Sequence, residues 1–257
     1  MISLSPHFIP ILLTFIMSGG ALFFGILSSP ILTFIFILSG WVISLCVHEF
    51  GHAFAAYKGG DRTIPYMGYL SFDPLRYMDP QMSIILPVLI MIMGGFGFPG
   101  GAVYINHHLL KNRNWRSFAV AAGPLGTLAC LFVLMLPLWL GLDQVIGHEN
   151  FWYAWSYLAL IEVFVIVLNL LPIPGFDGYG IIEPFLPYQT AASLYNYKYY
   201  GPLIFLGILM FIPPVNHGLW NIVFTLSKTL GIETVYAAMG QHDFFFFKTF
   251  FRELFNS

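Results

Sequence analysis

The sequence predicts an all-α integral membrane protein, a bundle of about six transmembrane helices with a glycine-rich re-entrant loop and a short β-strand. Two observations predict this class. Only 9% of the 257 residues are charged and 58% are hydrophobic, whereas a water-soluble domain carries about 25% charged residues. Long segments also lack any charged residue, and a helix needs about 20 apolar residues to span a bilayer. These segments are 8–47, 81–106, 117–142 and 199–227.

The first uncharged segment is long enough for two spans, because Ser28, Ser29 and Pro30 interrupt it. The later uncharged segments 117–142 and 199–227 each predict one span, and the apolar segment 151–171, which contains Glu162, predicts another. A further apolar stretch at 82–105 continues into Gly94–Gly101, whose glycines and proline do not suit a full spanning helix. The predicted spans are therefore 8–28, 31–57, 117–140, 151–171 and 201–226, although Pro213 and Pro214 interrupt the last of them.

Basic residues on both sides of 82–105 predict that this segment is re-entrant. Because basic loops face the cytoplasm, a segment with basic residues on both flanks enters and leaves the membrane on that side. Its tail, Ala102–Ile105, has strand character. The flanking basic residues are Lys58, Arg62 and Arg76 before the segment and Lys111, Arg113 and Arg116 after it.

The loop 141–150 has no lysine or arginine and is predicted to be external. The spans 31–57 and 151–171 then both run inward and end on the cytoplasmic side. At the C-terminus, phenylalanines and a leucine of 247–255 share one helical stripe, which fits an interfacial amphipathic helix or an ordinary packed helix equally well. We expect one transmembrane domain over 1–257, with a retained N-terminal anchor and no separate soluble domain.

The span 31–57 contains the pattern H-E-x-x-H at His48, Glu49 and His52. Residues i and i+4 share a helix face, so both imidazoles can reach one metal ion, and Glu49 lies beside them to act on a water there. An ionisable residue near the centre of a membrane helix costs roughly 2.5–3.5 kcal/mol, which favours a functional role. Lys58 follows His48 by ten residues, which places the site about 15 Å below the aqueous boundary.

The same helix face carries the small residues Ser44, Gly51 and Ala55. Small residues let another membrane helix approach closely, as a metal site built from several helices requires. Cys46 lies two residues before His48, but residues two apart on a helix do not face each other. Cys46 and Cys130 are therefore interpreted as buried free thiols.

A catalytic zinc ion commonly has three protein ligands, and Asp177 is the candidate for the third. It lies in the segment Asn169–Gly178, where two prolines stop the helix and glycines let the chain turn back. The turn would deliver Asp177 to a similar depth from the same side of the membrane. Considered alone, this loop would favour a solvated turn residue at Asp177, and the H-E-x-x-H motif is what favours a ligand instead.

The two motifs together resemble the site-2 protease family of intramembrane metalloproteases. That family combines H-E-x-x-H in one transmembrane helix with N-x-x-P-x-P-x-x-D-G in a later one, and the resemblance covers roughly residues 40–180, including Gly94–Gly101 and Ala122–Leu125. One departure is Thr127, where the family often has asparagine, so the resemblance does not support a polar role there. The resemblance implies that one zinc ion is bound by His48, His52 and Asp177, with Glu49 as the base and Asn169 supporting the substrate backbone.

The resemblance implies an enzyme that cleaves a peptide bond within or near a transmembrane segment of a membrane protein. Its compact form is similar to prokaryotic members, which implies the cell membrane and an active site nearer the cytoplasm. The expected partners are a transmembrane substrate and the lipid bilayer, possible self-association is left open, and no basic patch indicates nucleic acid. The alternative is a non-catalytic zinc-containing protein that binds partner helices, although such a site has no use for Glu49.

A substrate helix must unwind before it is cut, which exposes amides that lipid cannot satisfy. An exposed strand edge can accept them by β-augmentation, and we predict that Ala102–Ile105 provides that edge. Glu162, seven residues before Asn169, is a second acid inside a span. It is either functional or a protonated acid bonded to a neighbouring helix.

Overall fold

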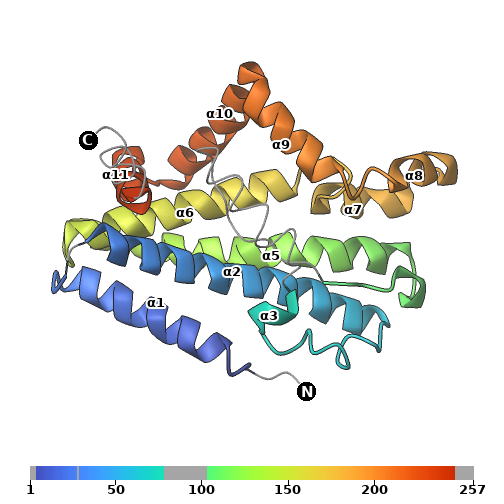
Figure 1. The fold of residues 1–257 in the computed structure, drawn as a ribbon, viewed down its shortest axis with the longest axis horizontal. Coiled ribbons are helices and arrows are strands. Elements are labelled where there is room, and N and C mark those ends of the chain that lie inside the picture. Colours follow the sequence, from blue (N-terminus) through green and yellow to red (C-terminus); the bar gives the residue numbers. More distant parts are fainter. Residues whose placement is uncertain (1–3, 28, 78–102, 247–257) are drawn as a thin grey trace, which may run out of the picture. The chain divides into compact units, whose positions relative to one another are not determined.

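The computed structural model describes residues 4–27, 29–77 and 103–246, and every regular element among them is a helix (Figure 1). The α-helices are α1 (Phe8–Phe23), α2 (Pro30–Gly59), α3 (Pro74–Tyr77), α5 (Arg113–Trp139), α6 (Glu149–Asn169), α7 (Asp177–Ile182), α8 (Tyr188–Tyr195), α9 (Gly201–Phe211), α10 (Pro213–Leu230) and α11 (Thr234–Phe244). Short 3-10 helices are η2 (His107–Leu109), η3 (Leu142–Gln144) and η4 (Glu183–Phe185).

Three of these helices, α2, α5 and α6, are long and apolar enough to cross a membrane. They match the spans predicted at 31–57, 117–140 and 151–171. Helix α1 is apolar but has only 16 residues, so it is shorter than the span predicted at 8–28. The pair α9 and α10 would make a fourth span if its two parts cross the membrane together. The chain is therefore a multi-pass membrane protein, and all the regular structure in its described residues is helical.

The span predicted at 201–226, which Pro213 and Pro214 interrupt, is a bent pair of helices in the structure. Helices α9 and α10 are bent by 100° where they meet, and the bend is visible in Figure 1. Pro213 has no N–H to continue the helix and disfavours helical geometry in the residue before it. Ile212 accordingly has φ −119° and ψ 88°.

Two other predicted features fall wholly or mostly outside the residues that the structure describes. Most of the predicted re-entrant segment 82–105 lies within 78–102, and the predicted C-terminal stripe lies within 247–257. The predicted strand at Ala102–Ile105 is not shown, because its described residues, Val103–Ile105, have no regular secondary structure.

The chain divides into two compact units whose boundary crosses several helices. One unit comprises 1–9, 44–128 and 165–219, and the other comprises 10–43, 129–164 and 220–257. The second unit has an aromatic core in which the rings of Phe15 and Phe36 stack at 4.7 Å. Its Trp155 indole donates a 2.8 Å hydrogen bond to the Leu134 carbonyl. A single domain over 1–257 remains a prediction.

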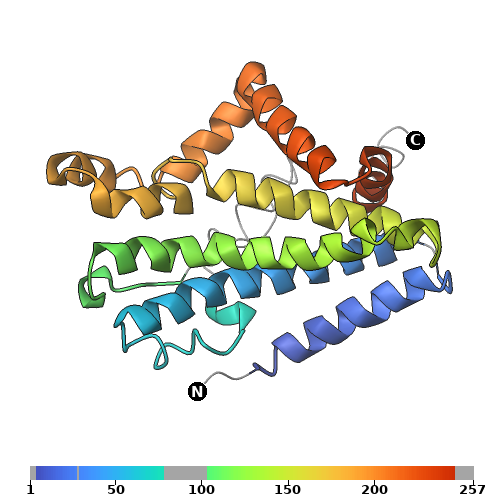
Figure 2. The ribbon, with the colours of Figure 1, turned by 180° about the vertical axis from the view of Figure 1, so that it is seen from behind.

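In the first unit, the second half of α2 packs directly on the first half of α5 (Figure 2). A side chain at Gly51 would collide with the Ala122 carbonyl oxygen, and a Cβ at Gly126 would lie 2.9 Å from the Val47 carbonyl oxygen. The two helices run antiparallel, since rising numbers on α2 meet falling numbers on α5. The predicted close approach of a second helix to this face is confirmed at Gly51.

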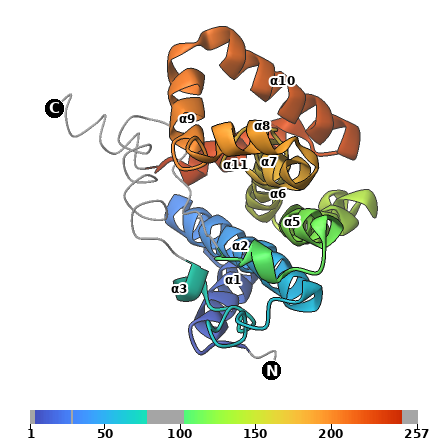
Figure 3. The ribbon, with the colours of Figure 1, turned by 90° about the vertical axis from the view of Figure 1, so that its right-hand side faces the viewer.

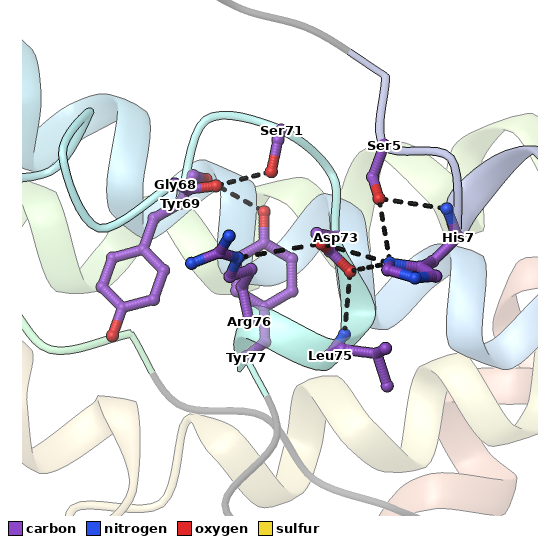
Figure 4. Close-up of polar contacts among 9 residues, drawn as sticks. All are labelled: Ser5, His7, Gly68, Tyr69, Ser71, Asp73, Leu75, Arg76 and Tyr77. Carbon is purple, nitrogen blue, oxygen red and sulfur yellow. Dashed lines mark hydrogen bonds and ion pairs between the residues drawn. The ribbon is translucent and has the colours of Figure 1, made fainter.

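The loop before α3 lies beside this half of α2 (Figures 1 and 3). Its Phe72 has a left-handed backbone with φ 49°, and its ring stacks on that of Phe50 at 4.1 Å. The neighbouring Asp73 carboxylate is 3.2 Å from His7 Nδ1, as Figure 4 shows. The N-terminal segment and the helix carrying the H-E-x-x-H motif therefore pack on the same loop.

We expect Gly51→Ala to destabilise the protein, because the added methyl group meets backbone that cannot move aside. Overpacking of this kind costs about 1–3 kcal/mol. Thermal unfolding in detergent should show a lower midpoint. The matched control is Gly207→Ala in α9, where a Cβ would meet nothing within 4 Å, and where alanine is intrinsically favoured in a helix. Equal midpoints for the two variants would contradict the proposed contact.

Candidate metal centre

Helix α2 brings the imidazoles of His48 and His52 together. One helical turn separates the two residues, and their Nε2 atoms are 3.1 Å apart. Both side chains are buried. Two nitrogen ligands for one ion therefore come from a single rigid helix.

Helix α5 supplies a hydrogen-bond partner for Nδ1 of each ring, the nitrogen that faces away from the other histidine. His52 Nδ1 lies 2.9 Å from the Ala119 carbonyl oxygen, and His48 Nδ1 lies 2.9 Å from the Thr127 hydroxyl. A carbonyl only accepts, so His52 Nδ1 carries the proton and leaves the Nε2 lone pair free. A protonated Nδ1 on His48, donating to Thr127, leaves its Nε2 free in the same way. Such partners orient histidine ligands and fix their tautomer.

The chain beyond α6 turns back to deliver Asp177. Helix α6 ends at Asn169, and Gly175 then adopts φ 101°, which favours glycine. A side chain at Gly178 would collide with the Leu170 carbonyl, so the returning chain touches the end of α6. The Asp177 carboxylate lies 3.1 Å from His48 Nε2 through Oδ2 and 3.4 Å from His52 Nε2 through Oδ1.

The ligand atoms of His48, His52 and Asp177 lie within 4.8 Å of one another. Zinc–ligand bonds of about 2.0–2.1 Å at tetrahedral angles separate two ligand atoms by about 3.3 Å. The two Nε2 atoms are 3.1 Å apart, and each lies 3.1 or 3.4 Å from a different oxygen of the Asp177 carboxylate, which is close to that value. Two imidazoles and one carboxylate are also a donor set that zinc accepts, so the residues fit a zinc ion.

Glu49 is buried next to this cluster. Its carboxylate interacts electrostatically with His52, His48 and Asp177, and it accepts a hydrogen bond from the backbone N–H of Val103. Asn169 is the half-buried last residue of α6, and its amide makes no hydrogen bond within the part of the chain that the structure describes. The structure thus gathers the two histidines, the carboxylate ligand candidate and Glu49, while Asn169 stands at the start of the loop that carries Asp177.

Sequence reasoning missed three contributors to this centre. The departure from the family pattern puts a polar role at Thr127 in doubt, but the structure gives Thr127 one, because its buried hydroxyl bonds to His48. The sequence feature that could have predicted this bond is that threonine keeps a polar group, a hydroxyl, where the family often has an amide. The Ala119 carbonyl and the Val103 amide are backbone groups, and no side-chain pattern reveals them. Glu162 is buried on α6.

The fold and the site define a multi-pass helical membrane protein with a buried site for one metal ion. Its relatives identify the family. The chain is 41% identical over 210 residues to a protein named "Putative zinc metalloprotease Rip2" of Mycolicibacterium smegmatis, covering 80% of this chain and 78% of the relative. It is 38% identical over 207 residues to the Rip2 protein of Mycobacterium tuberculosis strain H37Rv, with the same coverage.

A protein named "Putative zinc metalloprotease YwhC" of Bacillus subtilis is 30% identical over 189 residues, covering 70% of this chain and 81% of the relative. The chain belongs to the site-2 protease-like family of zinc metalloproteases. Its cofactor is accordingly zinc, and its class of activity is proteolysis. No protein-family model matches the chain, and no solved structure does.

We expect Thr127→Val to weaken zinc binding by about 10- to 100-fold, the usual effect of removing a group that orients a histidine ligand. Competition with a chelator of known affinity measures this change on the purified protein. Thr127→Ser keeps the hydroxyl and should bind zinc nearly as the wild type does. Wild-type affinity in Thr127→Val would show that this hydroxyl does not support the site.

Proposed function

We propose that this chain is an intramembrane zinc metalloendopeptidase that hydrolyses a peptide bond within or near a transmembrane segment of a membrane protein. One observation carries the proposal. The cluster of His48, His52 and Asp177, with Glu49 beside it, is built on α2, a helix long and apolar enough to cross a membrane. A soluble substrate would not need a site there.

The proposed roles follow from the chemistry of each group. His48, His52 and Asp177 hold one zinc ion per chain. Bound zinc would supply Lewis acidity, which polarises a scissile carbonyl and makes water a stronger acid. Glu49 takes a proton from the attacking water as its oxygen bonds to the carbonyl carbon. Glu49 then passes that proton to the amine nitrogen as the peptide C–N bond breaks.

Charge placement supports an active site on the cytoplasmic side. Lys58 lies at the end of α2, and the Lys111 N–H donates a 2.9 Å bond to the Gly59 carbonyl, so the basic start of α5 lies at the same end. Basic residues mark cytoplasmic ends. His48 precedes Gly59 by 11 residues of helix, about 16 Å along the axis. We infer a position in the cytoplasmic half of a prokaryotic cell membrane.

The segment Val103–Ile105 supports a place for the unwound substrate. Val103 and Ile105 are partly buried against the apolar cluster that α2 and α5 form with neighbouring loop residues, whereas Tyr104 is 66% exposed. The cluster comprises Ala53, Ala55, Ala56, Ile64, Leu70, Leu110 and Ala119. This alternation is that of an extended edge, and the Val103 amide reaches Glu49. An extended substrate pairing with this edge would have its peptide bonds close to the proposed base. We propose that Asn169 binds the same substrate backbone.

We expect Glu49→Gln to keep zinc but to abolish cleavage, because the amide preserves shape but cannot accept the proton. Membrane-fragment proteomics of cells carrying wild type or Glu49→Gln identifies a substrate, and purified proteins in liposomes then test it. Zinc content is measured by metal analysis of the same samples. Unchanged turnover by Glu49→Gln would overturn the assignment of the base.

The same experiment separates the enzyme from a non-catalytic zinc protein. The enzyme cleaves its substrate, stops when a chelator removes zinc and recovers when zinc is returned. A protein that merely binds partner helices would retain zinc and capture the substrate, with no fragment in either the wild type or Glu49→Gln.

We expect Ile105→Pro to impair cleavage by about tenfold or more while zinc content is unchanged, because proline removes a backbone donor from the proposed edge. Ile105→Ala keeps that donor and serves as the matched control. Cleavage assays on the two variants decide the matter. Equal losses would mean that side-chain packing, and not the backbone edge, is what Ile105 contributes.

A further inference from the structure

Asp61 is a carboxylate with no exposed surface, located just beyond α2. The helix ends in a Schellman motif, in which the Asp61 N–H donates to the Ala56 carbonyl at 3.0 Å and the Gly60 N–H to the Tyr57 carbonyl at 3.3 Å. Gly60 has φ 127°. This turn directs the Asp61 side chain back beside the helix end.

The two oxygens of Asp61 serve different parts of the chain. Oδ1 accepts from the Thr63 N–H at 3.0 Å and from the Thr63 hydroxyl, and Oδ2 accepts from the Asn106 N–H at 2.9 Å. Burying a carboxylate is costly unless its oxygens are hydrogen-bonded. Thr63 alone would close the turn, so the bond to Asn106, 45 residues away, is what requires the second oxygen.

The bond to Asn106 determines where the preceding three residues lie. Val103 and Ile105 pack on the apolar cluster of α2 and α5, and the Val103 amide donates to Glu49. An extended chain covers about 3.3 Å per residue, so only about 10 Å of chain separates the Asp61 bond from the Glu49 bond. A displaced Asn106 would move the Val103 amide with it.

A second attachment holds the other end of this segment. The Lys111 N–H donates to the Gly59 carbonyl at 2.9 Å, and a Cβ at Gly60 would lie 2.7 Å from the Leu109 carbonyl oxygen. Residues 107–111 are thus attached to the end of α2 without Asp61. Asp61 therefore fixes the position of the part of this segment nearest Glu49, residues 103–106.

We propose that Asp61 is a positioning residue of the protease, whose buried carboxylate holds residues 103–106 so that the Val103 amide meets Glu49. The inference rests on the proposed role of Glu49. Small misplacements of a catalytic group reduce rates steeply, with about 1 Å costing up to 100-fold. The effect of losing Asp61 is therefore expected in the chemical step.

Asp61→Asn is the decisive variant, because an amide presents hydrogens to one of the donors that the carboxylate accepts from. We expect kcat per zinc-loaded molecule to fall about tenfold or more, with zinc content unchanged and KM within about threefold. Amide hydrogen exchange should rise selectively in 103–106, and this readout does not depend on activity. The full chain in detergent or nanodiscs is used throughout.

Asp73→Asn is the matched control. Asp73 is also buried in the same unit, accepts a backbone N–H from Leu75 at 3.2 Å and contacts His7 (Figure 4). Among the described residues, its bonds do not reach 103–106. This variant should lower the unfolding midpoint, with kcat and exchange in 103–106 unchanged. A Thr63→Val variant, which keeps the bond to Asn106, should also retain kcat.

Unchanged kcat and unchanged exchange in Asp61→Asn would overturn the inference. Parallel losses of kcat and midpoint in Asp61→Asn and Asp73→Asn would overturn it as well, since they indicate general loss of structure. If Glu49→Gln cleaved the substrate as fast as the wild type does, the proposed function would be overturned instead. In that case the exchange of 103–106 still decides whether Asp61 holds the segment.

Discussion

The direct backbone contact between α2 and α5 is the constraint on which the rest of the structure depends. Lipid offers no hydrophobic force to drive membrane helices together, so they associate through close packing and hydrogen bonds. Gly51 and Gly126 let the two backbones touch. Only at that separation can His52 reach the Ala119 carbonyl and His48 reach Thr127, each at 2.9 Å. A wider spacing would leave two imidazoles buried, unoriented and without partners for their outer nitrogens.

Buried acids are the second organising feature. Three acids are matched to groups that fit their positions: Asp177 faces the two imidazoles, Glu49 accepts from the Val103 amide, and Asp61 accepts from Thr63 and Asn106. Such groups are expensive to bury without partners. Their contacts therefore join segments that the helices alone would leave apart, namely the return from α6 and the residues before η2.

Much of the fold was predictable, because hydropathy and helix periodicity are local properties. The spans that became α2 and α5 follow from uncharged segments of sufficient length, and the span that became α6 follows from an apolar segment that contains one acid, Glu162. The interruption of the last span at Pro213 and Pro214 is visible in the sequence, but the 100° bend there is not, since a proline's effect on direction depends on what the two halves pack against. The H-E-x-x-H motif and Asp177 were identified from sequence, and the structure places their ligand atoms within 4.8 Å. Their chemical roles remain proposals.

The sequence by itself determined the class of protein and the side chains of the candidate site, because both are written in residue types at fixed short spacings. Only the tertiary structure decided what surrounds them. The partners of His48 and His52 lie 79 and 67 residues away, and the partner of Asp61 lies 45 residues away. Two of those partners are backbone groups that any residue type possesses. Such pairings depend on which helix faces come into contact, and no local pattern carries that information.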